Sequence, residues 1–432
     1  MMNPITYENR TRTYELLSMD VTRHCNARCK FCFNDWKKLS PAVMNEETFR
    51  KVLTLLPLVP EDGFYLSCLF EPSIYPAFFH FLKLIPKEYR SKVFFTTNLV
   101  TRLTGEQIQA VFDANIDHVN VSLETFDPGI YQELTGVRRT SFYENLTAFA
   151  EVAKGSKVKL RLITMMLNST KDELIETVQK AHELYAPFEH EIRTPFPFEA
   201  DEKQVAEYAQ ELMTKEEVGR LCDGLMGLGY SNLQISAGWD QETYRIYQMG
   251  NQKKSKQKET IRKTKYDIRI EADGRVHFGG TDRYFDLKNI SNPPEWFQKE
   301  LAVLQKEETD RFFEGQCSGR KLHIEKKRAY PFSIDEAVLY DGHFLHIRGW
   351  DAYSVTGDAA SDRVLIFKCG FKNKICHVIS TQRMDVVQAM HDEQLLWSGF
   401  ETCVETSPEE LKRAKLYMGY RKEDDIYAFL LS

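Results

Sequence analysis

The chain has 432 residues, of which 42% are hydrophobic and 28% are charged, and its formal net charge is −6. This composition is typical of globular proteins and excludes a disordered or fibrous chain, while the length predicts two or three domains. The acidic balance argues against a nucleic-acid-binding protein, and no apolar run is long enough to span a bilayer.

The first residues, MMNPITYENRTRTYELL, contain no apolar stretch behind a basic segment, so no signal peptide is expected. We therefore expect a cytoplasmic protein, whose thiols stay reduced and serve as ligands or catalysts before they form disulfides. Three of the nine cysteines, Cys25, Cys29 and Cys32, share one short loop, and the other six are scattered.

The first half of the chain alternates between apolar strand-like stretches and amphipathic helical ones. Strands are predicted at 14–22, 63–70, 92–98, 118–125, 157–167 and 190–195. Helices are predicted at 45–59, with Asn45 as N-cap, at 104–115, starting at Thr104, and at 76–85, 141–154 and 170–185. This alternation predicts a parallel sheet with helical crossovers, either a doubly wound sheet or an incomplete barrel. In both folds, binding residues gather at the C-terminal ends of the strands.

The pattern changes after residue 197. Residues 201–229 are predicted to be helical, and the lysine-rich stretch 253–265 is typical of a solvated loop but could dock an acidic peptide or a phosphorylated sugar. A hairpin with its turn at Asp273-Gly274 is predicted over 266–280, followed by a helix over 293–307. From about residue 330, short apolar stretches between turn signals predict a separate β-sandwich.

The loop VTRHCNARCKFCFND holds Cys25, Cys29 and Cys32 directly after the first predicted strand. Structural zinc usually takes four ligands in two close pairs, and there is no second pair here, although a distant His or Cys could complete a site. A nucleophilic cysteine needs one thiol and a base, and three buried thiols are unexpected in so polar a loop. An iron–sulfur cluster is the remaining alternative. Its four irons usually take four thiolates, so three thiolates leave one iron open.

This CxxxCxxC motif, with Phe31 before the last cysteine, resembles the signature of the radical S-adenosylmethionine (SAM) enzymes. The resemblance implies a partial (β/α)6 TIM-like barrel in which Cys25, Cys29 and Cys32 hold one [4Fe–4S] cluster. It also implies that the open iron chelates SAM, and that reductive cleavage of SAM yields a radical that abstracts hydrogen from a substrate. The electron would come from an external one-electron reductant such as flavodoxin or ferredoxin.

Other strand ends carry further matches to this family. The stretch CLFEP resembles its Gly-Gly-Glu-Pro segment, with Glu71 and Pro72 matching and with Leu69 and Phe70 in place of the glycines. Ser122 and Glu124, two residues apart, face the same side of a strand. The resemblance implies a cofactor-binding set of Phe31, Glu71, Asn98, Ser122, Glu124, Arg138, Arg139 and Asn168. The two arginines suit bidentate binding of the SAM carboxylate, and a solvated surface charge is the alternative for either.

Three further residues lie on the predicted strands. Cys68 could donate a hydrogen atom to a substrate radical, and a small buried thiol is the commoner role for such a residue. Glu191 and Arg193 share one face of the sixth strand and could touch the cofactor or line the substrate cavity.

The hairpin and the helix after it resemble the SPASM or twitch extension of the family. Where the family hairpin ends in a cysteine, this chain has Phe278-Gly279-Gly280, so we expect a single cluster. A half-site built from Cys222 and Cys317 is the alternative. The last hundred residues resemble a β-sandwich module of glycan and secondary-metabolite enzymes. Three aromatic residues of this module could form a platform that binds a sugar: Trp350, Trp397 and Phe400. Packing in a core is the more usual role for such residues.

The expected domains are a radical SAM core over 1–200, a SPASM-like extension over 201–329 and a β-sandwich over 330–432. The first hypothesis is an enzyme that abstracts hydrogen from a peptide, leading to epimerisation or crosslinking. A sugar or aminocyclitol is the alternative substrate. A non-catalytic binding protein that retains the cluster loop is the alternative from another class. We expect no membrane or nucleic-acid partner, and the C-terminal domain could mediate dimerisation.

Overall fold

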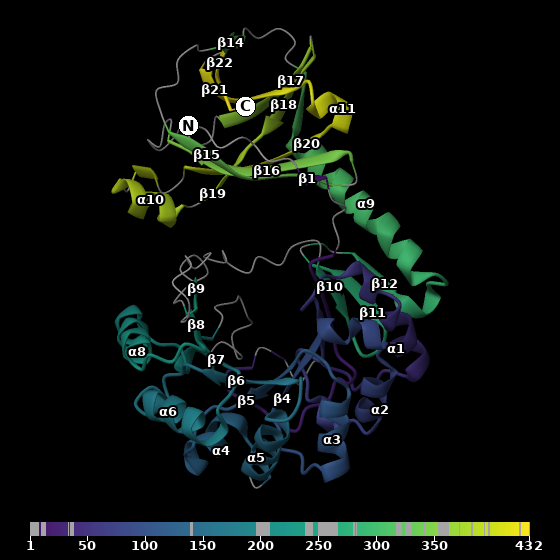
Figure 1. Ribbon diagram of the computed structural model, residues 1–432, viewed down its shortest axis with the longest axis vertical. Coiled ribbons are helices and arrows are strands. Elements are labelled where there is room, and N and C mark those ends of the chain that lie inside the picture. The colour runs from purple at the N-terminus through teal and green to yellow at the C-terminus, as the bar shows by residue number, and fades with distance from the viewer. Residues whose placement is uncertain are drawn as a thin grey trace. The chain divides into compact units, whose positions relative to one another are not determined.

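The chain folds into two compact units, Tyr14–Phe297 and Met1–Thr13 with Gln298–Ser432 (Figure 1). The computed structural model describes residues 8–9, 14–32, 34, 39–138, 141–195, 208–237, 245–248, 267–279, 281, 283–316, 322–324, 331–340, 342–352, 363–370, 372–381, 383–392, 394–395, 398–422 and 425–431. Within these residues, no helix is long and apolar enough to cross a membrane. The division into three domains stays a prediction.

One sheet of eleven strands runs through the larger unit. Its centre consists of the six predicted strands, which pair in parallel and in chain order: β2 (Leu16–Met19), β3 (Phe64–Leu66), β4 (Val93–Thr97), β5 (His118–Ser122), β6 (Lys159–Met165) and β7 (Glu189–Arg193). Two more parallel strands extend it, β8 (Leu233–Ala237) beside β7 and β10 (Asp267–Ile270) beside β2. Three antiparallel strands complete it: β9 (Arg245–Gln248), β11 (Arg275–Phe278) and β12 (Tyr284–Asp286). Among the described residues no pairing joins β9 to β12, so the sheet is an incomplete barrel.

Helices connect these strands and lie along the outer side of the sheet (Figure 1). They are α1 (Glu46–Leu53), α2 (Ala77–Leu84), α3 (Gly105–Asp113), α4 (Pro128–Thr135), α5 (Phe142–Ala153), α6 (Leu174–Tyr185) and α8 (Lys215–Gly227), with short 3₁₀ turns at Leu56–Leu58, Pro72–Ile74, Lys87–Lys92 and Leu287–Asn289. The Asn45 side chain caps α1 by accepting the Thr48 N–H at 2.8 Å, as predicted. Thr104 opens α3 in a capping box with Gln107.

One helix of this series is absent from the prediction. Asp127 precedes α4 and accepts the N–H groups of Gly129 and Ile130, and Pro128 occupies the first helical position. Gly136 ends the helix in the left-handed conformation, with φ of 71°. These start and stop signals are all in the sequence, but Pro128, Gly129 and Gly136 so close together are also typical of a loop.

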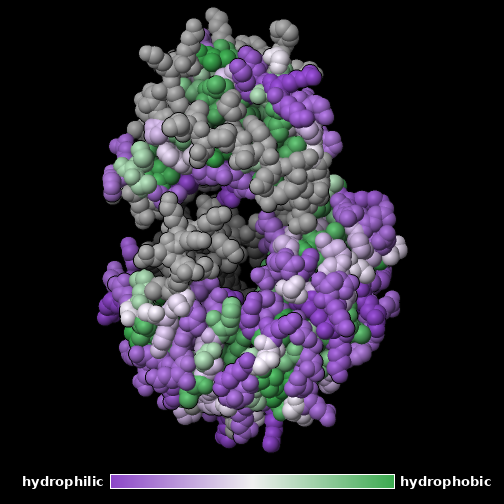
Figure 2. Space-filling model, viewed as in Figure 1, coloured by the Kyte–Doolittle hydropathy of each residue, from purple (hydrophilic) through white to green (hydrophobic). Residues whose placement is uncertain are grey.

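The two faces of the sheet differ in character. On the outer side, apolar residues of β7 and β8 pack against α6 and α8 in one buried cluster that includes Ile192, Ile235, Val178 and Leu225. Neighbouring residues of the same strands alternate to the other face. The larger unit therefore has its apolar core under the helices, and Figure 2 shows mostly hydrophilic side chains, with small apolar patches, on the surface in view.

The predicted hairpin is formed by β10 and β11 and turns at Asp273-Gly274. Gly274 has φ of 91°, a conformation that favours glycine, and its N–H bonds to the Glu271 carbonyl at 2.8 Å. The long helix after it, α9 (Pro293–Phe312), starts in the same unit. Tyr14, just before β2, donates its hydroxyl to the Phe297 carbonyl of α9 at 2.7 Å, and β10 of the hairpin pairs with β2, the first strand of the core.

The smaller unit contains two sheets that share one buried core. One sheet holds β1 (Glu8–Asn9), β15 (Phe332–Tyr340), β16 (Phe344–Asp351), β20 (Gly399–Glu405) and β19 (Ile379–Thr381). The other holds β13 (Phe313–Gln316), β18 (Lys372–His377), β17 (Arg363–Cys369), β21 (Lys415–Lys422), β22 (Asp425–Leu430) and β14 (Leu322–Ile324). Two short helices, α10 (Met384–Met390) and α11 (Pro408–Leu411), complete it.

Phe400 lies in the shared core of these two sheets, where it is 1% exposed. It therefore has the core-packing role. Trp350 is partly exposed on β16, and Trp397 lies outside the described residues. The lysine-rich stretch 253–265 and Cys317 are also outside them.

Candidate functional site

The cysteine loop leaves the C-terminal end of β2 and returns to the core before α1. A short antiparallel bridge between Thr22 and Val43 closes it at its base. The Arg23 N–H also bonds to the Ala42 carbonyl at 2.8 Å, and the Met44 N–H to the Val21 carbonyl at 2.9 Å. The loop is therefore a closed excursion from the end of a strand, which is where the sequence predicts a site.

Helix α4 supports the middle of this loop. The N–H groups of Arg28 and Lys30 bond at 2.8 Å to the carbonyls of Thr135 and Leu134, which lie in the last turn of the helix. Carbonyls in a last turn have no partner within their own helix. The loop therefore caps α4, and the helix in turn fixes the backbone between Cys25 and Cys32.

The three thiols lie close enough together to affect one another. Burial raises the pKa of Cys25 to about 11, and Glu71 and Cys32 add to the rise. Burial also raises the pKa of Cys29 well above its usual value, with Glu124 and the other two thiols contributing. Burial likewise raises the pKa of Cys32, whose N–H closes a turn on the Cys29 carbonyl at 3.0 Å. Three partly buried thiols at one strand end match the donor set of a cluster with an open iron. Phe31 is partly buried between the last two cysteines.

Glu71 is a buried support beneath this loop. Its Oε1 accepts the Thr97 hydroxyl at 2.7 Å and the Ser73 N–H at 3.0 Å, and its Oε2 accepts the Asn98 N–H at 2.6 Å. Burial raises the pKa of its carboxyl. Glu71 therefore joins the ends of β3 and β4, and its predicted contact with the cofactor stays a prediction.

Asn98 connects that support to the thiols. Its Nδ2 lies 3.8 Å from the Cys25 Sγ and donates to the Asn26 Oδ1 at 2.8 Å. Its Oδ1 accepts the Val100 N–H at 3.1 Å, which fixes the orientation of the amide. The predicted polar residue at the end of β4 therefore contacts the cysteine loop.

Glu124 approaches the same thiols from the end of β5. It is 4% exposed, and burial raises the pKa of its carboxyl to about 7, while its Oε2 accepts the Met165 N–H at 3.0 Å. Its charge is close enough to raise the pKa of Cys29. Ser122 ends β5 two residues earlier and is partly exposed.

The remaining predicted residues lie farther out. Arg138 is exposed just after the end of α4, and Arg139 lies outside the described residues. Asn168 is exposed, and its side chain donates to the Gln210 carbonyl at 3.2 Å while its N–H bonds to the Glu211 carbonyl at 3.0 Å. Its contacts are thus with a later segment rather than with the cysteine loop. The Cys222 thiol is on α8, and burial raises its pKa to about 11.

The inner face of the sheet is polar. The Tyr65 hydroxyl on β3 and the Thr96 hydroxyl on β4 are 2.6 Å apart, and the Asn120 Nδ2 on β5 donates to Thr96 at 3.3 Å. Burial raises the pKa of Cys68 to about 11, and its thiol is also hydrogen-bonded to Tyr65. Arg193 is close enough to lower the pKa of both Cys68 and Tyr65. Cys68 therefore faces a polar interior.

Glu191 organises the other half of this inner face. Its carboxylate accepts from Arg161 and Arg193, each at 2.7 Å, and from the Ser236 hydroxyl at 2.8 Å. Burial alone would raise the pKa of Glu191, but Arg193 and Arg161 outweigh it and lower the pKa to about 2. Two guanidinium groups are therefore held in place on the side of the sheet opposite the helices.

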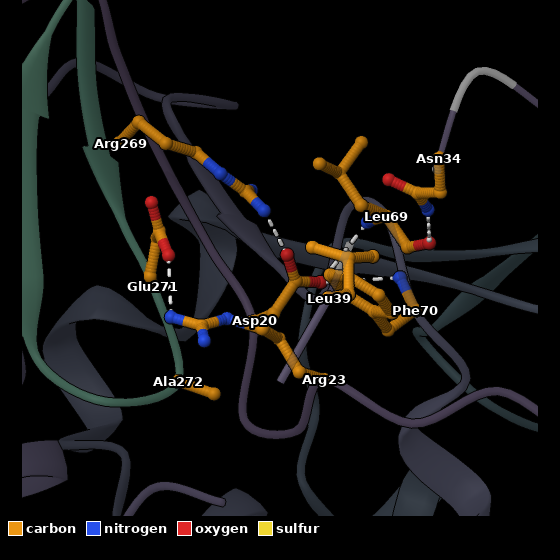
Figure 3. A pocket seen from close by; sticks show the side chains of 9 residues that line it. All are labelled: Asp20, Arg23, Asn34, Leu39, Leu69, Phe70, Arg269, Glu271 and Ala272. Atoms are coloured by element: carbon orange, nitrogen blue, oxygen red, sulfur yellow. Dashed lines mark hydrogen bonds and ion pairs between the residues drawn. The ribbon is translucent and has the colours of Figure 1, made fainter. Parts of the chain in front are cut away.

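Asp20 is a site residue that the sequence analysis missed. It lies between β2 and the cysteine loop, and its carboxylate pairs with Arg269 of β10 and accepts N–H groups of the segment after β3 (Figure 3). Asp20 and Arg269 also line a cavity of about 130 Å³ beside Leu69 and Phe70. An acidic residue at a strand end next to the cysteine motif was the available signal, but its partner lies 249 residues away.

Residues 19–181 match the family described as the radical SAM superfamily. This segment is a radical SAM domain. It contains the cysteine loop, Glu71, Asn98 and Glu124, and members of the superfamily are enzymes. The radical SAM family uses a [4Fe–4S] cluster and SAM, and the three thiols of the loop fit the donor set of such a cluster.

Two curated relatives are GTP 3′,8-cyclases. The chain is 21% identical to that of Limosilactobacillus fermentum over 246 residues, covering 56% of this chain and 70% of the relative. It is 30% identical to the probable GTP 3′,8-cyclase of Thermococcus kodakarensis over 133 residues, covering 30% of this chain and 42% of the relative. Among solved structures, Streptococcus suis SuiB bound to S-adenosylmethionine aligns at 16% identity with a TM-score of 0.47 and covers 66% of each chain.

Proposed function

We propose that this protein is a radical SAM enzyme that uses one [4Fe–4S] cluster to cleave SAM reductively and to abstract hydrogen from a substrate. One observation carries the proposal: Cys25, Cys29 and Cys32 gather at the end of β2 beside Asn98 and Glu124. When bound, the cluster and SAM supply a 5′-deoxyadenosyl radical. An external one-electron reductant such as flavodoxin or ferredoxin would deliver the electron.

In this proposal the residues around the loop hold and orient the cofactors. Asn98 fixes the Cys25 side of the loop through its amide. Ser122 and Glu124 face the position of SAM, and Arg138 or Arg139 binds its carboxylate, because a guanidinium can form a bidentate pair with a carboxylate. Glu71 supports Asn98 by accepting a hydrogen bond from its backbone N–H.

The substrate would bind on the inner face of the sheet. This face presents hydroxyl, amide and guanidinium groups, and Cys68 lies beside Tyr65 there. Such a surface suits a polar substrate with hydrogen-bonding groups. In the same proposal, Cys68 is positioned to donate a hydrogen atom to a substrate radical.

A peptide is the first substrate class, with epimerisation or crosslinking as the outcome. Its support is the β10–β11 hairpin, which resembles the SPASM-type extension of peptide-modifying members and packs on the first strand of the core. A nucleotide is the second class, favoured by the similarity to GTP 3′,8-cyclases. A sugar or aminocyclitol is the third.

The test is anaerobic reconstitution with iron and sulfide, followed by reductant and SAM. We expect about four irons per chain and formation of 5′-deoxyadenosine. The Cys29→Ala variant should lose both, whereas Cys222→Ala removes a partly exposed thiol elsewhere and should keep both. A loaded protein that forms no 5′-deoxyadenosine would contradict the enzyme proposal, and iron near eight per chain would contradict the single cluster.

The substrate class is tested by adding GTP or a candidate peptide to the same assay. Stimulation of 5′-deoxyadenosine formation by GTP, with conversion of GTP, would replace the peptide by the nucleotide. Deuterium from solvent appearing in a peptide α-carbon would support epimerisation and a hydrogen donor such as Cys68. In that case the Cys68→Ala variant should still form 5′-deoxyadenosine but should incorporate less deuterium.

A further inference from the structure

The carboxylate of Asp20 accepts hydrogen bonds from every residue of one turn. The residues that follow β3, 67–70, are called the β3 turn here. The Oδ1 atom of Asp20 accepts the N–H groups of Cys68 and Leu69 at 2.9 Å each, that of Phe70 at 3.3 Å, and the Ser67 hydroxyl at 3.4 Å. The side chain is 1% exposed. Successive N–H groups that converge in this way form an anion-binding concavity, and the anion bound here is the Asp20 carboxylate.

The β3 turn has a backbone that depends on such an acceptor. Ser67 has φ of 80°, which lies in the left-handed region that favours glycine. The Ser67 hydroxyl also bonds to the Phe70 carbonyl at 3.0 Å, which closes the turn on itself. Leu69 and Phe70 stand where the family typically has two glycines, so this chain forms the turn without them. The Asp20 carboxylate is the group that gathers its N–H groups.

The other carboxylate oxygen of Asp20, Oδ2, forms an ion pair with the guanidinium group of Arg269, which extends from β10 (Figure 3). The position of Arg269 is fixed by the sheet, because it pairs with Ser18 in the β10–β2 register and the Asp20 N–H bonds to the Ile270 carbonyl at 3.2 Å. Burial raises the pKa of Asp20, and Arg269 reduces that rise. A buried carboxylate needs such a partner to remain charged.

The β3 turn and the residue that follows it are hydrogen-bonded to the cysteine loop, before the first cysteine and after the last one. Before the first cysteine, the His24 carbonyl accepts the Glu71 N–H at 3.2 Å, directly after the turn. After the last cysteine, the Asn34 Nδ2 donates to the Leu69 carbonyl at 3.1 Å. A change in the shape of the turn would therefore move both ends of the loop.

We propose that Asp20 and Arg269 are positioning residues for SAM binding. They hold the β3 turn in the shape that places the cysteine loop and its open position, so the β10–β11 hairpin is part of the cofactor site. This inference rests on the proposed function. It assigns to the hairpin, in which no cluster ligand stands at Phe278, an electrostatic role in the core.

The Asp20→Asn variant tests this role. It keeps one oxygen for the turn but places an amide NH₂ against the Arg269 guanidinium, which leaves a buried charge without its partner. We expect about four irons per chain, because the three cysteines are intact, and SAM affinity reduced by about tenfold or more. Hydrogen exchange of a peptide covering residues 67–70 should be faster than in the wild type, with or without SAM.

Two further variants complete the test. Arg269→Gln removes the cation and leaves the bonds between Asp20 and the turn, and it should weaken SAM binding in the same direction, while Arg269→Lys restores part of the affinity. Arg275→Gln is the matched control, since this exposed arginine lies on the same hairpin and pairs only with hairpin carboxylates in the contacts described. It should leave SAM affinity and exchange at 67–70 unchanged.

The inference is overturned if Asp20→Asn or Arg269→Gln, folded as judged by thermal melting, binds SAM like the wild type. It is also overturned if SAM affinity falls while exchange at 67–70 is unchanged, because the effect would then not pass through the turn. A wild type that binds no SAM would contradict the proposed function instead. The exchange measurement needs no SAM and would still decide whether Asp20 holds the turn.

Discussion

The Asn98 amide donates a hydrogen bond to the Cys25 thiol at the edge of the sheet, with Nδ2 3.8 Å from Sγ. The amide cannot rotate freely, because Asn26 and Val100 occupy its other hydrogen-bonding positions. Hydrogen bonds to cluster sulfurs stabilise the reduced, more negative state and so raise the reduction potential. We therefore predict that Asn98 raises the reduction potential of the cluster in the proposed enzyme.

The first prediction concerns this amide. Asn98→Ala should keep about four irons per chain but lower the potential of the reconstituted protein, because the donor to Cys25 is lost. A hydrogen bond worth about 1 kcal/mol corresponds to roughly 40 mV for one electron. Redox titration followed by electron paramagnetic resonance measures the shift. Asn292→Ala, at an exposed asparagine whose side chain bonds to Glu295, is the control and should not change the potential.

The strand pattern of the core could be predicted because each strand carries a local apolar signal. All six strands of 14–193 and the hairpin turn at Asp273-Gly274 are present. The triad of cysteines, Asn98 and Glu124 could be placed together because parallel strands end at one edge of a sheet. Helix α4 was missed because Pro128 and Gly136, which mark its ends, are close together and are also typical of a loop.

The parts that could not be predicted depend on contacts between distant residues. Nothing local indicates that β10 pairs with β2, and this pairing brings Arg269 to Asp20 across 249 residues. The supporting role of Glu71 was equally hidden, because its partners Thr97 and Asn98 come from the next strand. Sequence reasoning therefore found the residues that face the thiols more readily than the residues that hold them.

The second prediction concerns Glu71 as a buried support. Glu71→Gln replaces one carboxylate oxygen by an NH₂ group, which would face the N–H of Asn98 or of Ser73, or the Thr97 hydroxyl. A buried donor without an acceptor costs about 1–3 kcal/mol, so the free energy of unfolding should fall by that amount. Urea denaturation of the protein without added iron measures it. Glu88→Gln, at an exposed glutamate of the same unit, should change it by less than about 0.5 kcal/mol.

The third prediction concerns pH and the buried His190. This residue bonds through Nε2 to the Thr164 hydroxyl at 2.9 Å, and burial lowers its pKa from 6.5 to about 3. Between these two values the unfolded chain binds a proton that the folded chain does not, so the free energy of unfolding falls as the pH falls. The slope is about 1.4 kcal/mol per pH unit for one proton.

Urea denaturation at pH 7, 6 and 5 checks this dependence. His190→Gln keeps a polar partner for Thr164 but removes the titrating group, so its stability should fall less steeply with decreasing pH than that of the wild type. The difference between the two proteins cancels the carboxyl groups, including Glu124, whose raised pKa acts in the opposite direction. Parallel slopes for His190→Gln and the wild type would contradict the prediction.

The fourth prediction concerns Gly136, where α4 ends and the cysteine loop docks. Gly136 has φ of 71°, and a Cβ built on it would lie 3.5 Å from the Arg28 Cβ in the loop. Space is therefore sufficient, and the cost of Gly136→Ala is the left-handed backbone, about 1–2 kcal/mol. Part of this strain should be relieved by movement of the last turn of α4, whose Leu134 and Thr135 carbonyls hold the loop.

We therefore expect Gly136→Ala to lower both the melting temperature and the iron retained after reconstitution. Gly155→Ala is the matched control, because Gly155 follows α5, has ordinary backbone geometry and has no atom within 4 Å of an added Cβ. It should retain the wild-type iron content. If Gly136→Ala lowers the melting temperature but loads about four irons as fast as the wild type, α4 stabilises the fold without fixing the loop. If iron loading is slower than in Gly155→Ala at equal temperature below both melting points, the contact between α4 and the loop positions the thiols.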